Sequence, residues 1–150
     1  GDCAGTYPCG HVSDEALRLI RITQQSFFEG IKYAREGHRL SDISAAVQAY
    51  VEANGCTVVR EYVGHGIGRH MHEPPEVPNY GKPGHGPRLL RGMTIAVEPM
   101  VNAGSAAIVQ MSDGWTVKTA DGKNAAHYET TVRITDGEPE LLTDPSESLV

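Results

Sequence analysis

The chain has 150 residues, of which 39% are hydrophobic and 21% are charged, and its formal net charge is -6 at pH 7. A chain of this length can bury a core without disulfides, and its mixed charges give no reason to expect a nucleic-acid or membrane partner. No apolar run approaches the roughly 18 residues that a membrane span needs, and the N-terminus lacks the basic and apolar regions of a signal peptide. We therefore expect a single domain over residues 1–150 that stays in the cytoplasm, where its three cysteines remain reduced.

Two helices are predicted in the first third of the chain. Over residues 13–36 the apolar side chains recur at the spacing that gives a helix one apolar face. Ser13 can cap its start, and Gly37 can take the left-handed conformation after its last turn. A second helix is predicted from Ser41, another capping residue, to Asn54.

Beyond residue 55 the pattern changes to short β-type runs separated by glycine and proline. Strands are predicted at residues 56–63, 94–97, 115–119 and 127–134. Residues 64–87 are predicted to form one long loop, and a loop of this length in a compact domain is usually functional or disordered. Helices followed by antiparallel strands indicate an α+β fold with the helices packed on one face of the sheet.

Four residues that lie far apart in the sequence are candidate metal ligands, namely Asp2, His65, Glu98 and Glu129. Taken singly, each is more often a satisfied polar group or a solvent-facing side chain. Glu98, however, lies in an apolar run where a charge is costly unless it is paired or coordinated. Strand alternation also puts Glu129 on the same face as His127. Three carboxylates and one imidazole favour Mn, Co, Fe or Zn, and two such ions about 3.5 to 4 Å apart activate a shared water as hydroxide.

The segment 64–75 is the most specific pattern in the chain. It reads Gly-His-Gly-Ile-Gly-Arg-His-Met-His-Glu-Pro-Pro, and its glycines let backbone approach closely around His65. A later histidine, His72, can reach over the same cavity. Considered alone, the segment fits a glycine-rich turn with exposed histidines equally well.

Four motifs, taken together, resemble those of the type I methionine aminopeptidases. They are His-Gly-Ile-Gly-x-x-x-His-Glu-x-Pro from His65, Glu-Pro-Met-Val-Asn-Ala-Gly from Glu98, Asp-Gly-Trp-Thr-Val from Asp113 and Tyr-Glu-Thr-Thr from Tyr128. Their order and spacing match the family over nearly the whole chain, whereas prolidases, aminopeptidases P and creatinases share the fold but fit less well. The resemblance implies a pita-bread fold and an enzyme that removes N-terminal methionine from nascent proteins through a metal-bound hydroxide.

Carried over residue by residue, the resemblance makes Asp2, His65, Glu98 and Glu129 the ligands of two divalent ions, which could be Co, Mn, Fe or Zn. Glu98 is also implied as the general acid/base, a role that needs a carboxylate beside the hydroxide.

The resemblance further implies that His72 contacts the substrate and steadies the tetrahedral intermediate as it gains charge. Met71 and Trp115 would form walls of the methionine pocket, although core packing is the ordinary role of such side chains. Cys3 and Cys9 are expected to be buried apolar side chains, because no base is placed beside either one. The remaining histidines receive no catalytic role: His11, His38, His70, His85 and His127.

The family's site has a fifth ligand, an aspartate upstream of the Gly-Asp pair with which this sequence opens. The resemblance therefore implies the C-terminal part of such an enzyme, with its sheet incomplete at the N-terminus and the upstream segment as a further partner. Asp2 would lie at a free end, which frays unless neighbours hold it, and an unpaired sheet edge would expose apolar surface. We accordingly expect low activity from this chain alone.

Two other interpretations are kept. In the first, a catalytically incomplete pita-bread domain acts as a binding or assembly module, and a stability that does not respond to chelators would distinguish it. In the second, the protein is a dinuclear peptidase that cleaves before proline, which substrate choice would reveal.

Overall fold

The computed structural model of the protein describes residues 1–143. In this part of the chain there are two helices, α1 (Asp14–Ile31) and α2 (Leu40–Ala53). The strands are β1 (Cys3–Ala4), β2 (Thr57–Val58), β3 (Gly64–Gly66), β4 (Glu73–Val77), β5 (Thr94–Val97), β6 (Met100–Asn102), β7 (Ile108–Gln110), β8 (Val117–Thr119), β9 (Ala125–His127), β10 (Glu129–Arg133) and β11 (Glu140–Leu141).

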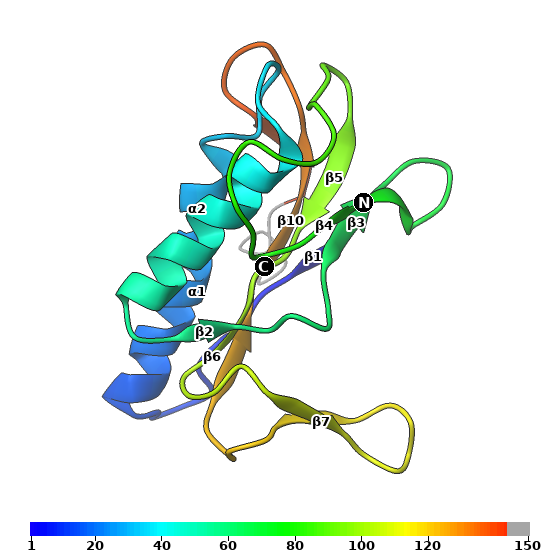
Figure 1. The fold of residues 1–150 in the computed structure, drawn as a ribbon. Coiled ribbons are helices and arrows are strands. Elements are labelled where there is room, and N and C mark those ends of the chain that lie inside the picture. The colour runs from blue at the N-terminus through cyan, green and yellow to red at the C-terminus, as the bar shows by residue number, and fades with distance from the viewer. Residues whose placement is uncertain (144–150) are drawn as a thin grey trace.

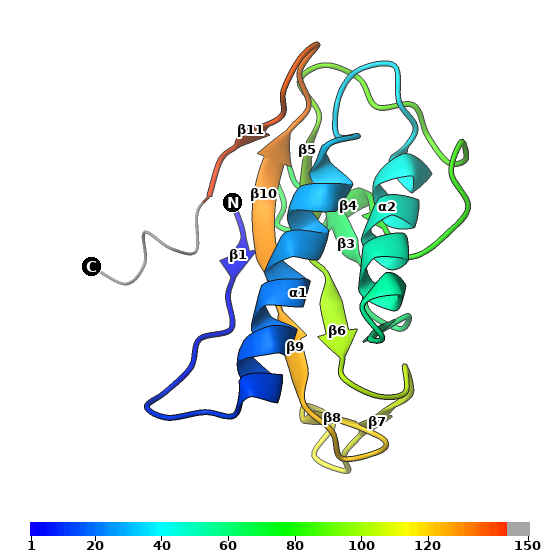
Figure 2. The same cartoon turned by 90° about the vertical axis from the view of Figure 1, so that its left-hand side faces the viewer.

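The strands form antiparallel sheets on which the helices lie. The largest sheet has the order β1-β10-β5-β3-β4, with β11 also paired to β10. A smaller sheet has the order β2-β6-β9, and β7 pairs with β8 as a hairpin that extends from the bottom of the molecule (Figure 1). Both helices lie on the same side of the strands, as the view in Figure 2 shows. The predicted α+β fold, with helices on one face of an antiparallel sheet, is confirmed.

Helix α1 begins where the sequence predicts, because the Ser13 hydroxyl accepts a hydrogen bond from the Ala16 amide at 3.2 Å. The helix ends at Ile31, earlier than predicted. Gly37 does take a positive φ of 93°, but it lies in the following loop and does not cap the helix.

The prediction that Ser41 caps α2 is wrong. The helix begins one residue earlier, and the Asp42 carboxylate accepts a hydrogen bond from the Arg39 amide at 2.8 Å. The Ser41 hydroxyl instead bonds the backbone of His85, which ties the helix start to a distant loop. The predicted helix end is confirmed, since Gly55 takes a positive φ of 74° directly after it.

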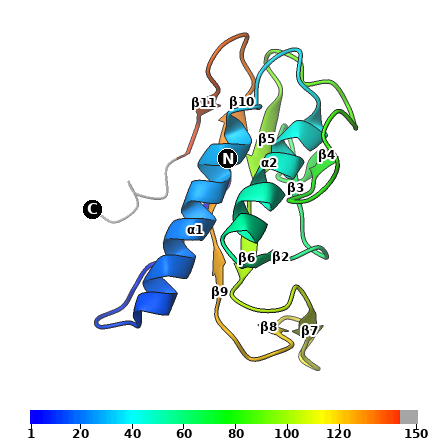
Figure 3. The same cartoon turned by 60° about the vertical axis from the view of Figure 1, so that its left-hand side comes forward.

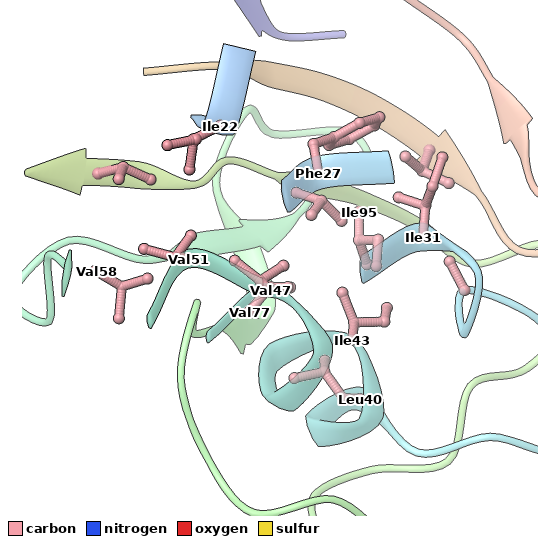
Figure 4. Packing of buried hydrophobic residues seen from close by; sticks show 14 of the residues in the cluster. Ile22, Phe27, Ile31, Leu40, Ile43, Val47, Val51, Val58, Val77 and Ile95 are labelled. Carbon is pink, nitrogen blue, oxygen red and sulfur yellow. The ribbon is translucent and has the colours of Figure 1, made fainter. Parts of the chain in front are cut away.

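The core lies between the helices and the sheet. Its side chains come from both helices and from the central strands, and include Val132 of β10. Figure 4 labels Phe27, Ile43, Val47 and Ile95 among them. Full burial of each such side chain contributes roughly 1.5–3 kcal/mol. The two helices run side by side (Figure 3).

Their close approach depends on Gly30. A Cβ on Gly30 would lie 2.6 Å from Cγ2 of Val47, so α1 and α2 could not pack at this distance with any larger residue there.

The predicted long loop over residues 64–87 is wrong, because it contains β3 and β4. Glycine has a low strand propensity, yet β3 is held between two neighbours and only glycine fits there. A Cβ would lie 2.2 Å from the Ala96 carbonyl at Gly64 and 2.3 Å from the Pro74 carbonyl at Gly66. Tertiary packing therefore overrides the local preference.

Two further expectations change. Cys3 and Cys9 are exposed and only Cys56 is buried, so the expectation that the first two fill a core is wrong. The predicted strand at 56–63 is reduced to β2, and the predicted strand at 127–134 is divided between β9 and β10.

Candidate metal centre

The order of the strands brings the four predicted ligands together. Asp2 precedes β1, Glu129 opens β10, Glu98 follows β5 and His65 lies in β3. These are four successive neighbours in the largest sheet, so residues separated by long stretches of sequence lie on adjacent strands. In the register, Ala4 lies opposite Glu129, and His65 lies opposite Ala96.

Glu98 and Glu129 face each other at the junction of the two sheets. On one side of the junction Val97 pairs with Thr130, and on the other side Met100 pairs with His127. The register continues unchanged between these pairs, which places Glu98 opposite Glu129. Two carboxylates directly opposite each other repel, and a cation between them removes that repulsion.

The donor atoms lie at distances that suit a metal site. Ligand atoms of His65, Glu98 and Glu129 all lie within 4.8 Å of one another, and so do those of Asp2, His65 and His72. His65 belongs to both sets, so it links the predicted ligands in one continuous cluster. The structure thus brings together Asp2, His65, Glu98 and Glu129, while their role as ligands stays a prediction.

The orientation of His65 is fixed by its own strand. Its Nδ1 lies 2.9 Å from the Gly66 carbonyl oxygen. Because a carbonyl can only accept, Nδ1 donates this bond, and in the neutral imidazole Nε2 presents a lone pair. This Nε2 lies 3.5 Å from Oε1 of Glu98. A lone pair and a carboxylate oxygen so close together fit a site for a shared cation.

Glu129 is the most strongly perturbed acid of the cluster. It is only 5% exposed, and its Oε1 is buried with no hydrogen-bond partner among the described residues. Burial, which is the largest effect, and the negative charges of Glu98 and Asp2 together raise the pKa of Glu129 to about 7, against the opposing effects of His127 and His65. A buried carboxylate that has one oxygen without a hydrogen-bond partner and lies beside other carboxylates fits a divalent ion, which would hold it in its charged form.

Hydrogen bonds to neighbouring residues hold the backbone of Asp2, which is the condition under which a terminal strand does not fray. The Thr131 hydroxyl accepts a bond from the Asp2 amide and donates one to the Asp2 carbonyl, both at 2.8 Å. The Thr143 hydroxyl donates to the same carbonyl at 2.8 Å. These bonds, together with the pairing of β1 and β10, fix the backbone that carries the carboxylate.

His72 lies directly before β4, with its ring centroid 4.3 Å from that of His65. It is exposed, which suits a residue that meets a substrate, and this role stays a prediction. Met71 is 48% exposed beside it, whereas Trp115 is 89% exposed in the turn between β7 and β8. The assignment of Met71 and Trp115 to a methionine pocket also stays a prediction.

His127 has no role predicted from the sequence, yet the structure places it at the cluster. Its Nε2 lies 3.6 Å from Oε2 of Glu98 and 3.9 Å from Oε2 of Glu129. The alternation that puts His127 and Glu129 on one strand face was the signal that could have identified it. His127 also lines an apolar cavity of about 300 Å³ with Met100 and Val59.

Carboxylates and imidazoles that converge on adjacent strands of an antiparallel sheet are typical of a divalent-metal enzyme. The chain belongs to metallopeptidase family M24, whose sequence pattern matches residues 1–136. Within residues 1–143, neither helix is long and apolar enough to cross a membrane.

Several known proteins are similar to this chain. A methionine aminopeptidase from Clostridium perfringens is 59% identical over 142 residues, which cover 95% of this chain and 57% of that protein. Methionine aminopeptidase 1 from Bacillus subtilis is 51% identical over 143 residues, which cover 95% of this chain and 58% of that protein. The chain thus spans little more than half the length of these curated relatives.

Solved structures confirm the predicted pita-bread fold. The crystal structure of methionine aminopeptidase from Thermotoga maritima aligns with a TM-score of 0.93 and 46% identity, over 96% of this chain and 58% of that chain. An X-Pro aminopeptidase from the same organism aligns with a TM-score of 0.71 and 20% identity, over 96% of this chain and 35% of that chain. This second likeness concerns the fold alone.

Proposed function

We propose that the chain carries the greater part of the active centre of a metal-dependent aminopeptidase that removes N-terminal methionine from peptides and nascent proteins. The observation that carries the proposal is the convergence of Asp2, His65, Glu98 and Glu129 in a chain of the M24 family. Relatives that are 51% and 59% identical bear the name methionine aminopeptidase, which supports the choice of substrate.

Asp2, His65, Glu98 and Glu129 are the proposed ligands of two divalent ions, either Co, Mn, Fe or Zn. Three carboxylates and one imidazole suit these ions, and carboxylates can bridge two of them. When bound, the ions supply Lewis acidity toward the scissile carbonyl and a lowered pKa for water. An upstream aspartate, which the family resemblance implies, would add a fifth ligand.

Glu98 is the proposed general acid/base. Its side chain is 13% exposed and points one oxygen toward His65 and the other toward His127, so it lies within the cluster. It accepts a proton from the attacking water and returns that proton to the amine nitrogen as the carbon–nitrogen bond breaks. The carboxylate therefore ends the reaction in the state in which it began.

His72 is the proposed substrate contact. Its imidazole lies next to His65 and is exposed, so it can donate a hydrogen bond to the carbonyl oxygen of a bound peptide as that oxygen gains negative charge. Met71 and Trp115 complete the proposal as walls of the methionine pocket. A cytoplasmic location is proposed with them, because all three cysteines are free thiols.

The retained cluster argues against a binding or assembly module. Glu129 is 5% exposed and lies beside two other carboxylates, and this arrangement costs folding free energy when no cation is present. A domain that only binds a partner protein gains nothing from that cost.

The test is release of free methionine from the peptide Met-Ala-Ser by the 150-residue chain, with added Mn²⁺ or Co²⁺ and with a chelator. Glu98→Ala is the test variant, and Glu52→Ala on the exposed side of α2 is the matched control. An Ala-Pro-Ser peptide tests cleavage before proline in parallel.

We expect metal-dependent methionine release that the chelator and Glu98→Ala abolish and that Glu52→Ala preserves. Release of alanine from Ala-Pro-Ser without release of methionine from Met-Ala-Ser would replace the proposed substrate with an X-Pro peptide. Absence of release from both peptides, in protein shown by calorimetry to bind the metal, would contradict the proposed activity for this chain.

A further inference from the structure

His127 lies at the end of β9 on a backbone that is fixed from two sides. Its amide donates to the Thr6 hydroxyl and its carbonyl accepts from the same hydroxyl, both at 2.9 Å. On the other side β9 pairs with β6, where Met100 lies opposite His127. The imidazole is therefore presented to the metal centre by a rigid segment and not by a mobile loop.

The inner nitrogen of this imidazole lies between two carboxylates. Nε2 of His127 is buried and has no hydrogen-bond partner among the described residues. It lies 3.6 Å from Oε2 of Glu98 and 3.9 Å from Oε2 of Glu129. Burying a polar nitrogen without a hydrogen-bond partner costs folding free energy, so a functional role for Nε2 is expected.

Glu98 has an imidazole on each side. Its Oε1 faces Nε2 of His65 at 3.5 Å and its Oε2 faces Nε2 of His127 at 3.6 Å. Asn79 holds the same residue through its backbone, because its side-chain amide donates to the Glu98 carbonyl at 3.0 Å. The side chain of Glu98 has no comparable anchor among the described residues apart from these two imidazoles.

We propose that His127 is a positioning residue, which donates a hydrogen bond from Nε2 to Oε2 of Glu98 and so holds Oε1 of that carboxylate toward Nε2 of His65, the pair that would hold a metal ion. The inference rests on the proposed metal centre and not on peptide cleavage. A bond from an imidazole to a ligating carboxylate fixes its orientation and raises metal affinity. Such bonds are commonly long in unliganded sites and shorten when the site is filled.

The geometry favours positioning over direct ligation. The two sets of donor atoms within 4.8 Å of one another in the described part of the chain both contain His65, and neither contains His127. His127 therefore adjoins the cluster without completing a set of three donors.

The test compares His127→Gln with His127→Asn in the 150-residue chain. The terminal amide nitrogen of glutamine can occupy the place of Nε2, whereas the shorter asparagine cannot reach it. His11→Ala removes an exposed imidazole elsewhere and is the control. Affinity for Co²⁺ is measured by calorimetry and by the visible absorption of the bound ion, and a urea titration of the metal-free protein reports folding.

We expect His127→Asn to weaken Co²⁺ binding by about 10- to 100-fold and His127→Gln to stay within about threefold of the native protein. If His127→Asn fails to fold, His127→Leu takes its place as a variant without a donor. Equal affinity in all variants would overturn the proposal. Equal weakening in both, with an altered absorption spectrum, would overturn it too, because His127 would then be a ligand. Neither readout uses a peptide. The test of His127 therefore gives the same answer whether or not the chain cleaves peptides.

Discussion

Glu98 and Glu129 lie opposite each other at the junction of two antiparallel sheets, and the second of them is 5% exposed. A folded protein does not place two carboxylates in this way for its own stability, since burial and mutual repulsion both disfavour the charged forms. The pair therefore indicates a centre that is built for a cation, and its energetic cost can be measured.

The first prediction concerns the stability of the metal-free protein. The pKa of Glu129 rises from an ordinary value of 4.5 to about 7 in the folded state, so the unfolded chain loses this proton first as the pH increases. The contribution of Glu129 to stability consequently falls between pH 4.5 and pH 7 and stays low above that range. We expect Glu129→Gln to raise the free energy of unfolding by about 1–3 kcal/mol at pH 8 and to have little effect at pH 4.5.

Urea titration in the presence of a chelator, at both pH values, measures this difference. Glu52→Gln, at an exposed position of α2, is the control and should change neither value. A destabilising effect of Glu129→Gln at pH 8 would refute the account of the buried charge.

The second prediction concerns metal binding. An ion that binds only the folded state stabilises it, by about 2.7 kcal/mol at a hundredfold excess over its dissociation constant. We expect Mn²⁺ or Co²⁺ to raise the melting temperature of the native chain and of His85→Ala, but not that of His65→Ala. Differential scanning fluorimetry with and without chelator measures the shift. An equal rise in His65→Ala would place the ion elsewhere.

The third prediction concerns the glycines of β3. A Cβ at Gly66 would lie 2.3 Å from the Pro74 carbonyl, and this backbone atom cannot move aside without breaking the pairing of β3 with β4. We expect Gly66→Ala to cost about 2 kcal/mol or more in stability and to weaken Co²⁺ binding, because His65 lies on the same strand. Gly137→Ala, where a Cβ meets no atom within 4 Å, is the control for urea titration and calorimetry. Similar losses in both variants would contradict the steric argument.

The fourth prediction concerns the anchor of Asp2. Thr131→Val removes a hydroxyl that bonds both the amide and the carbonyl of Asp2. We expect a loss of about 1–3 kcal/mol in stability and weaker Co²⁺ binding, since the carboxylate loses its fixed backbone. Thr135→Val removes a hydroxyl that bonds the Glu138 carbonyl in an exposed turn, and it should leave the affinity unchanged. Calorimetry that finds native affinity in Thr131→Val would show that Asp2 needs no such anchor.

The fifth prediction tests the proposed pocket wall. Trp115 is 89% exposed, so Trp115→Ala should change the free energy of unfolding by no more than about 0.5 kcal/mol. If Trp115 contacts the substrate, KM for Met-Ala-Ser rises while the melting temperature stays constant. An unchanged KM would remove Trp115 from the pocket.

The local sequence determined those parts of the protein whose signal is local. Ser13 caps α1 as predicted, and residues 94–97 form β5 with the predicted bounds, because side-chain periodicity and capping act within one turn or one strand. The chemical types of Asp2, His65, Glu98 and Glu129, with the motifs around them, were likewise enough to nominate the site.

Only the tertiary structure decided how these residues meet. β3 forms although its sequence is Gly-His-Gly, because it pairs with β4 and β5, and these neighbours leave no room for a side chain at positions 64 and 66. His127 reaches Glu98 because the register of β5 and β10 continues into β6 and β9, and no local pattern encodes that continuity. Periodicity reports which face a side chain takes within its own element, whereas the partner across the sheet depends on strand order and register, which the packing of the whole chain selects.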